Sequence, residues 1–188
     1  MRFLENLKFR LKVFLSALTW RKPIGSRLWV APYGIGINSD VLILYDEVMK
    51  DPWTGKKSLL LTFGSNVLEG VQSAKLDAFS EYHSQYEAPV DGYTRSLKWE
   101  FERTQNKILT DNKPSDDEYF IFRVRAETDE KGNLIRACYG KLYGPVEYGL
   151  RGGKAVLRMS CYFNPEVNSR NLEFDREKNL SGQKVHIP

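Results

Sequence analysis

Residues 118–143 read EYFIFRVRAETDEKGNLIRACYGKLY, and this stretch decides the fold class. Over Glu118–Glu127, alternation places Phe120, Phe122, Val124 and Ala126 on one side, which is the pattern of a β-strand with one buried face. The following Asp129–Asn133 contains Gly and Asn, which suit the positive φ angles of a hairpin turn. We therefore expect Leu134–Tyr143 to return as an antiparallel partner strand.

A second stretch, Ala155–Phe163, alternates in the same way. A short strand over Val146–Leu150 and a turn over Arg151–Lys154 connect it to the first stretch. Residues 118–163 together predict an antiparallel meander.

The earlier part of the chain contains four further segments that predict strands, and one segment whose structure is ambiguous. Ser73–Tyr86 has apolar residues at helical spacing and is interpreted either as a helix or as an irregular loop. The expected strands are Leu28–Ile37, Val41–Tyr45, Leu59–Phe63 and Ser96–Thr104.

Sheets with one apolar face must cover each other, which favours two packed layers. The predicted fold is mainly β: an antiparallel two-sheet sandwich, jelly-roll-like, with an N-terminal amphipathic helix. The predicted organisation is a basic amphipathic helix over residues 1–23, a β-sandwich domain over 24–163 and a polar C-terminal tail over 164–188. Pro23 and Gly25 suggest the first boundary.

Charge is concentrated at the N-terminus. The whole chain of 188 residues has a formal net charge of +4. Residues 1–22 contain six Lys and Arg but only one acidic residue, Glu5, so the remainder of the chain is close to neutral. A domain that binds nucleic acid usually has its positive charge on the folded body, so no nucleic-acid partner is expected.

The N-terminal segment has leucine and phenylalanine residues at spacings of three and four, as on one face of a helix. Three interpretations remain open: a terminal helix that packs on its own domain, a helix that lies on an anionic membrane surface, and an export signal. Lys12 interrupts the apolar stretch that an export signal would need. The cellular location is left open, with a membrane-associated or envelope location slightly favoured.

The sequence lacks the patterns of common catalytic sites. No G-x-S-x-G pentapeptide occurs, and only His83 and His186 are present as histidine bases. The glycine-rich run at 149–154 departs from the phosphate-binding pattern at both Glu147 and Ala155, so it is interpreted as a turn. We therefore favour a non-catalytic protein without a cofactor, and an enzyme with a histidine-free carboxylate site stays open as a third interpretation.

Metal and carboxylate chemistry are weakly supported. Cys138 and Cys161 lack the paired spacing of a zinc site, and they are interpreted as small apolar side chains or as disulfide partners if their strands pair. The acidic run between Asp111 and Glu118 lacks the spacing of an EF-hand loop. Glu100 and Glu102 share a strand face with a lysine, which favours a solvated surface over a glycosidase pair.

One constellation suggests a binding surface. On the strands within 118–163, the face opposite the core combines aromatic rings with cations, which suit sugar rings, carboxylates and phosphates. It could equally be an ordinary exposed sheet face, or one covered by a terminal segment. Its predicted ligand-binding residues are Tyr119, Arg123, Arg125, Tyr139, Lys141, Tyr143, Arg158 and Tyr162.

The sequence thus predicts a non-catalytic binding module, with a glycan or another envelope component as the preferred ligand. The alternative is a structural or interaction subunit that acts through protein–protein contacts and has no small ligand. An anionic membrane surface is a further expected partner, through residues 1–22.

Overall fold

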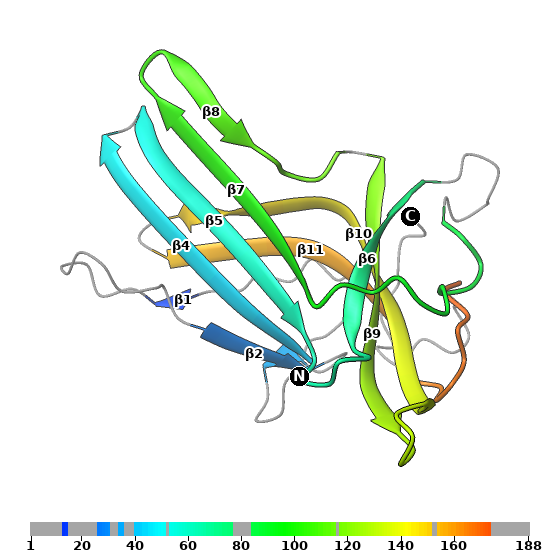
Figure 1. The fold of residues 1–188 in the computed structure, drawn as a ribbon. Helices are drawn as coiled ribbons and strands as arrows, with labels where there is room; N and C mark the ends of the chain where they lie inside the picture. Colours follow the sequence, from blue (N-terminus) through cyan, green and yellow to red (C-terminus); the bar gives the residue numbers. More distant parts are fainter. Residues whose placement is uncertain are drawn as a thin grey trace.

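The computed structural model shows a mainly β protein built from antiparallel sheets (Figure 1). The structure describes residues 13–14, 26–30, 34–35, 40–51, 53–76, 84–115, 117–151 and 154–173. Within these residues no helix is found, so none is long and apolar enough to cross a membrane.

The first sheet has five strands in the order β1-β11-β10-β9-β6. Each neighbouring pair is antiparallel, and the predicted hairpin between β9 and β10 is confirmed. The strands are β1 (Val13–Phe14), β6 (Gly70–Lys75), β9 (Glu118–Thr128), β10 (Leu134–Arg151) and β11 (Lys154–Asn164).

The second sheet has six strands in the order β3-β2-β4-β5-β7-β8, again antiparallel throughout. Two hairpins, β4–β5 and β7–β8, lie at the upper left of Figure 1. The strands are β2 (Ser26–Val30), β3 (Gly34–Ile35), β4 (Val41–Asp51), β5 (Thr54–Phe63), β7 (Ser96–Thr104) and β8 (Lys107–Asp111).

The two sheets share one apolar core. The ring of Phe63 on β5 lies 5.6 Å from that of Phe122 on β9, and Trp99 on β7 lies 5.4 Å from Phe120. These residues face inward because alternate side chains of a strand point to the same face. The inward parity predicted for Phe120, Phe122 and Val124 is confirmed, since all three are buried in this core.

β10 is a single long strand, and the separate strand expected over Val146–Leu150 is its second half. Figure 1 shows it curving, with its first part beside β9 and its later part beside β11. Its pairing with β11 is irregular between Tyr143 and Glu147. Tyr139–Leu142 pair with β9 on one side and with β11 on the other, and the irregularity that follows is of the kind that bends a strand.

The outer face of the five-stranded sheet is covered by two segments, residues 84–93 and 165–173, which we call the cover. The segments bond to each other: the Ala88 amide donates to the Arg170 carbonyl over 2.7 Å, and the Leu172 amide donates to the Tyr86 carbonyl over 2.9 Å. Ala88 and Leu172 are buried in a second apolar cluster with Tyr119, Ile121, Ala137 and Tyr139. The tail predicted from residue 164 is thus packed on the domain as far as residue 173.

Two helix expectations need correction where the structure describes them. Val13 and Phe14 form a strand, β1, opposite Ala155 and Lys154, because β-branched and aromatic residues suit pairing with the edge of β11. The rest of the predicted 1–23 helix lies outside the described residues.

The second correction concerns Ser73–Tyr86. Its first residues belong to β6, where Ser73 pairs with Phe120 of β9, and its last residues, from Ser84, form bends. Residues 77–83 lie outside the described residues. The irregular-loop interpretation agrees with residues 84–86, whereas neither interpretation holds for Ser73–Lys75, which pair with the strand β9.

Candidate functional site

The predicted ligand-binding face is largely buried beneath the cover. Tyr119, Arg123, Tyr139 and Lys141 are each at most 6% exposed. Tyr143 and Tyr162 are half-buried. The backbone of Arg158 belongs to β11, and its side chain lies outside the described residues.

Arg123 uses its guanidinium to hold loops. Its Nε donates to the Leu68 carbonyl, and its Nη1 donates to the Val90 carbonyl over 2.8 Å. The guanidinium carbon lies 4.3 Å from the ring centroid of Tyr93, whose hydroxyl donates to Pro89. A buried charge needs such partners, so Arg123 ties both neighbouring loops to β9.

Lys141 lies under the same cover and is 1% exposed. Its ammonium donates to Ser84 Oγ over 2.7 Å and lies 5.4 Å and 6.0 Å from the ring centroids of Tyr162 and Tyr143. Burial lowers the pKa of Lys141 to about 8, although the carboxylate of Glu173 acts in the opposite direction. The cation is therefore enclosed between a strand and both covering segments.

Arg125 is displaced from the predicted face. Its φ is 56°, an uncommon conformation for a non-glycine residue, and the pairing of β9 with β10 shifts register beside it. Its Nε and Nη2 donate to the two carboxylate oxygens of Asp40 over 3.0 and 2.9 Å. The guanidinium also lies 4.8 Å from the ring centroid of Phe163. Arg125 therefore joins the two sheets at their margin and does not extend the outer face.

A different set of polar residues lies on the inner side of the six-stranded sheet. Glu47, Lys57 and Phe101 stand directly opposite one another on β4, β5 and β7, and all three are half-buried. The preceding inward row, Tyr45, Leu59 and Trp99, is buried. The apolar core therefore ends at the row of Tyr45, Leu59 and Trp99. At the next row, Glu47, Lys57 and Phe101, the inner surface becomes polar and half-buried.

Lys57 is at the centre of this set. Its ammonium lies 5.3 Å from the ring centroid of Phe101 and 5.0 Å from that of Tyr148 on the facing sheet. It donates to the Tyr148 carbonyl over 3.3 Å. The lysine therefore bridges the two sheets between two aromatic rings, in an arrangement favourable for a cation.

The tyrosines beside Lys57 stay protonated at neutral pH. The Tyr45 hydroxyl donates to Glu47, and burial together with that carboxylate raises the pKa of Tyr45 far above its usual value. Burial, reinforced by negative charge on Asp111 and Glu100, raises the pKa of Tyr148 to about 12. Both therefore act as hydroxyl groups.

At the end of the same sheet, Arg103 of β7 packs against the exposed Trp53 of the β4–β5 turn. The guanidinium carbon lies 5.6 Å from the indole ring. We call this whole group the inner polar cluster; its members are Tyr45, Glu47, Trp53, Lys57, Phe101, Arg103 and Tyr148. It combines flat rings, hydroxyls, two cations and one carboxylate.

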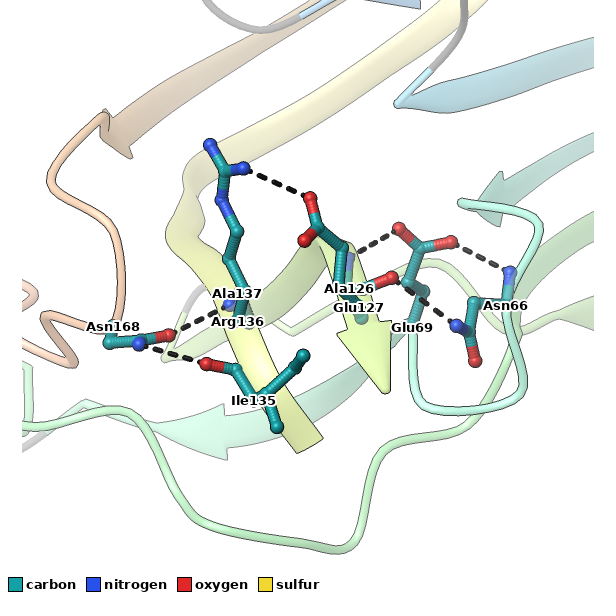
Figure 2. Close-up of polar contacts among 8 residues, drawn as sticks. All are labelled: Asn66, Glu69, Ala126, Glu127, Ile135, Arg136, Ala137 and Asn168. Carbon is teal, nitrogen blue, oxygen red and sulfur yellow. Dashed lines mark hydrogen bonds and ion pairs between the residues drawn. The ribbon is translucent and has the colours of Figure 1, made fainter. Parts of the chain in front are cut away.

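Figure 2 shows polar groups at the other end of the molecule that serve the backbone. Glu69 accepts from the amides of Ser65, Asn66 and Ala126 over 2.6–2.9 Å and so closes the turn before β6. Asn168 accepts from the Ala137 amide and donates to the Ile135 carbonyl over 2.9 and 3.1 Å. These side chains anchor loops, and their polar atoms are used by the fold.

The other residues considered from sequence do not form a reactive centre in the described part of the chain. Glu100 pairs with Lys98 over 3.1 Å and with Lys56 over 3.4 Å, on the outer face of its sheet. His83 and His186 lie outside the described residues, as does Asp116. No cluster of three or more His, Cys, Asp or Glu side chains suited to a metal is found among the described residues.

The two cysteines are free and buried. Cys161 is opposite Leu142 on β10, so Cys138 lies four residues away along that strand. Burial raises the pKa of both thiols. They therefore behave as small apolar side chains, and the predicted disulfide option is not seen.

Sequence reasoning missed most of the inner polar cluster. Glu47 and Lys57 lie in strands that extend beyond the apolar runs expected over Val41–Tyr45 and Leu59–Phe63. Strand alternation was the available signal. Glu47 lies four residues after Ile43 and Lys57 lies two residues before Leu59, so both charged side chains belong on the same face as these core residues.

No known protein family matches the chain, and neither the search of curated proteins nor that of solved structures found a similar protein.

Proposed function

We propose that the chain is a non-catalytic β-sandwich binding module, jelly-roll-like in its layering, and that its ligand is a glycan or another envelope component. The ligand contacts the inner polar cluster in this proposal. The outer face predicted from sequence is not used, because its cations hold the cover in place.

One observation supports this choice above others: Lys57 is half-buried between the rings of Phe101 and Tyr148, in line with Glu47. The neighbouring inward row of Tyr45, Leu59 and Trp99 is buried, whereas this row is half-buried and includes two charged residues. In this proposal the two charges serve the ligand.

The chemistry of the cluster suits a sugar. Rings offer flat apolar surfaces to the C–H faces of a pyranose, while a carboxylate and a lysine accept from and donate to its hydroxyls. Arg103 adds a group that binds carboxylate or sulfate in bidentate fashion, so acidic as well as neutral sugars are candidate ligands.

The test is a screen of the full chain against a panel of neutral and acidic oligosaccharides. Lys57→Met and Phe101→Ala should each weaken retention by about tenfold or more, as the loss of a charged hydrogen bond or a ring contact does. Lys56→Met is a matched control, because Lys56 is the neighbouring residue on the opposite face and is exposed. Retention of no oligosaccharide, or retention indifferent to both cluster substitutions, would remove the proposal.

The second candidate is a structural or interaction subunit with no small ligand. The observation that favours it is the exposed edge strand β8, which ends the six-stranded sheet. Light scattering on the purified chain separates the two: an obligate oligomer that retains no oligosaccharide supports this second function.

A membrane surface is a further proposed partner, on sequence grounds alone. The six basic residues within 1–22 should confer flotation with vesicles containing phosphatidylglycerol, and salt should weaken it. The paired substitution Lys8→Gln and Lys12→Gln should reduce flotation. Flotation unchanged by salt and by both substitutions would contradict an electrostatic attachment.

A further inference from the structure

One inward row of the six-stranded sheet continues across four strands, which lie side by side in Figure 1. Glu47, Lys57 and Phe101 are directly opposite one another on β4, β5 and β7, and Phe101 is directly opposite Asp111 on β8. Residues directly opposite in an antiparallel pair share a face, so all four belong to the inner face. The row therefore has a carboxylate at each end, with a lysine and an aromatic ring between them.

The register of β8 is what places Asp111 on this face. Leu109 is an extra residue in the pairing with β7, so Ile108 and Asp111 face the same side although they are three residues apart. The negative charge of Asp111 also acts on the hydroxyl of Tyr148 on the facing sheet, which agrees with an inward position. Asp111 therefore extends the inner polar cluster as far as the edge strand.

Access to the inner face increases from the core toward the β4–β5 and β7–β8 turns. The row that contains Trp99 is buried, and the row that contains Lys57 is half-buried. In the row beyond, Arg103 is half-buried and Ile108 is 57% exposed, while β5 contributes only Gly55, which has no side chain. The Lys57 row therefore has the apolar core on one side and the more accessible part of the inner face on the other.

We propose that the ligand is a neutral, extended glycan chain that lies across the strands along this row; the inference rests on the proposed function and narrows its ligand class. The row covers three strand spacings, roughly 14 Å, which is longer than one pyranose ring and corresponds to about three units of an extended chain. Glu47 and Asp111 accept from hydroxyls toward the two ends of the chain, and Phe101 packs against a sugar ring between them.

The charges at this end of the inner face favour a neutral chain. Carboxylates and cations are equal in number when the direct neighbours of the row are included. They are Glu47, Asp51 and Asp111 against Lys57, Arg103 and Lys113. An acidic polymer would bring negative groups against a carboxylate at either end of the row, and like charges in contact are unfavourable. The hydroxyls of a neutral sugar can donate to both carboxylates and accept from the lysine.

The experiment measures the binding of hexasaccharides to the full chain by isothermal titration calorimetry. The probes are cellohexaose and xylohexaose, which are neutral and extended, maltohexaose, which is neutral and coiled, and hexagalacturonate, which is acidic. We expect cellohexaose or xylohexaose to bind more tightly than the other two. For the extended chain that binds, affinity should rise by about tenfold or more from the disaccharide to the tetrasaccharide and little beyond it, because the row is then filled.

Asp111→Ala removes the carboxylate at one end of the row. The variant should bind the tetrasaccharide about tenfold more weakly than the natural chain does, as the loss of a hydrogen bond to a charged group predicts. An unchanged urea midpoint shows that it folds. Glu102→Ala is the matched control, because Glu102 follows Phe101 on the opposite face, where its carboxylate contacts Lys56. The control should bind the tetrasaccharide like the natural chain.

The outcomes separate this inference from the proposed function. Equal affinity for disaccharide and hexasaccharide, or a tetrasaccharide affinity that Asp111→Ala leaves unchanged, would overturn the inference while Lys57→Met still weakens binding and the proposed function stands. Preferred binding of maltohexaose or hexagalacturonate would have the same meaning. A natural chain that binds no oligosaccharide would overturn both.

Discussion

The outer face of the five-stranded sheet and the inner polar cluster contain the same local arrangement, a lysine flanked by two aromatic rings. Lys141 lies 5.4 Å and 6.0 Å from Tyr162 and Tyr143, while Lys57 lies 5.3 Å and 5.0 Å from Phe101 and Tyr148. The difference is access: Lys141 is 1% exposed beneath the cover, whereas Lys57 is half-buried.

This difference teaches that residue type does not define a binding surface; the remaining access and hydrogen-bonding capacity do. On the outer face, Arg123 and Lys141 donate to groups of the loops that cover them. In the inner polar cluster, Glu47, Phe101 and Tyr148 are half-buried, so part of each residue is accessible. The first group stabilises the fold, and we assign binding to the second.

The largest expected effect is on Arg123. Arg123→Ala removes the donors to the Leu68 and Val90 carbonyls and leaves both under-satisfied in a buried setting. Bonds from charged donors contribute about 1.5–3 kcal/mol each, so the free energy of unfolding should fall by about 3–5 kcal/mol. Urea unfolding measures this loss. A loss below about 1 kcal/mol would show that the outer face is not structural.

The next effect is on the pH dependence of stability through Lys141. Its pKa of about 8 in the folded protein is below the 10.5 of a free lysine, so the unfolded chain binds more protons between those values. The stability contributed through Lys141 should therefore rise as pH rises from about 8 to 10.5, by up to about 3 kcal/mol.

The measurement is the free energy of unfolding of the natural chain and of Lys141→Met across that pH range. Taking the difference removes the contributions of the cysteines and tyrosines, which titrate in the same range. A constant difference from pH 7 to 10.5 would contradict burial of the ammonium.

The smallest effect is expected in the inner polar cluster. Lys57→Met keeps most of the apolar stem and removes a half-exposed cation, so the free energy of unfolding should change by less than about 1 kcal/mol. The same urea titration measures it. A loss as large as that for Arg123→Ala would place Lys57 among the structural residues and erase the contrast between the two regions.

Sequence periodicity recovered the parts of the fold that alternate. It predicted both ends of β7 correctly and the ends of β9 and β11 to within one residue. It also assigned Phe120 and Phe122 to the core side. It also placed Tyr119 and Arg123 correctly on the opposite face. Alternation tells which face a side chain occupies, since successive residues point to opposite sides of a strand.

Periodicity could not tell whether the opposite face is covered. The covering segments have no repeat of their own, and they are fixed by backbone bonds such as that from Leu172 to Tyr86. It also missed the positive φ at Arg125, which turns one residue of the predicted face toward Asp40. Register irregularities of this kind come from tertiary packing and have no short-range sequence signal.

The most direct test of the central claim is the acetylation rate of individual lysines in the native full chain at pH 8, followed by mass spectrometry. Lys56, whose side chain is 52% exposed, is the fast reference. We predict that Lys57 reacts at a rate near that of Lys56, while Lys141 reacts at least about tenfold more slowly until the chain is unfolded. Acetylation of Lys141 as fast as Lys56 would contradict the account, because a lysine with a lowered pKa reacts readily once reagent reaches it.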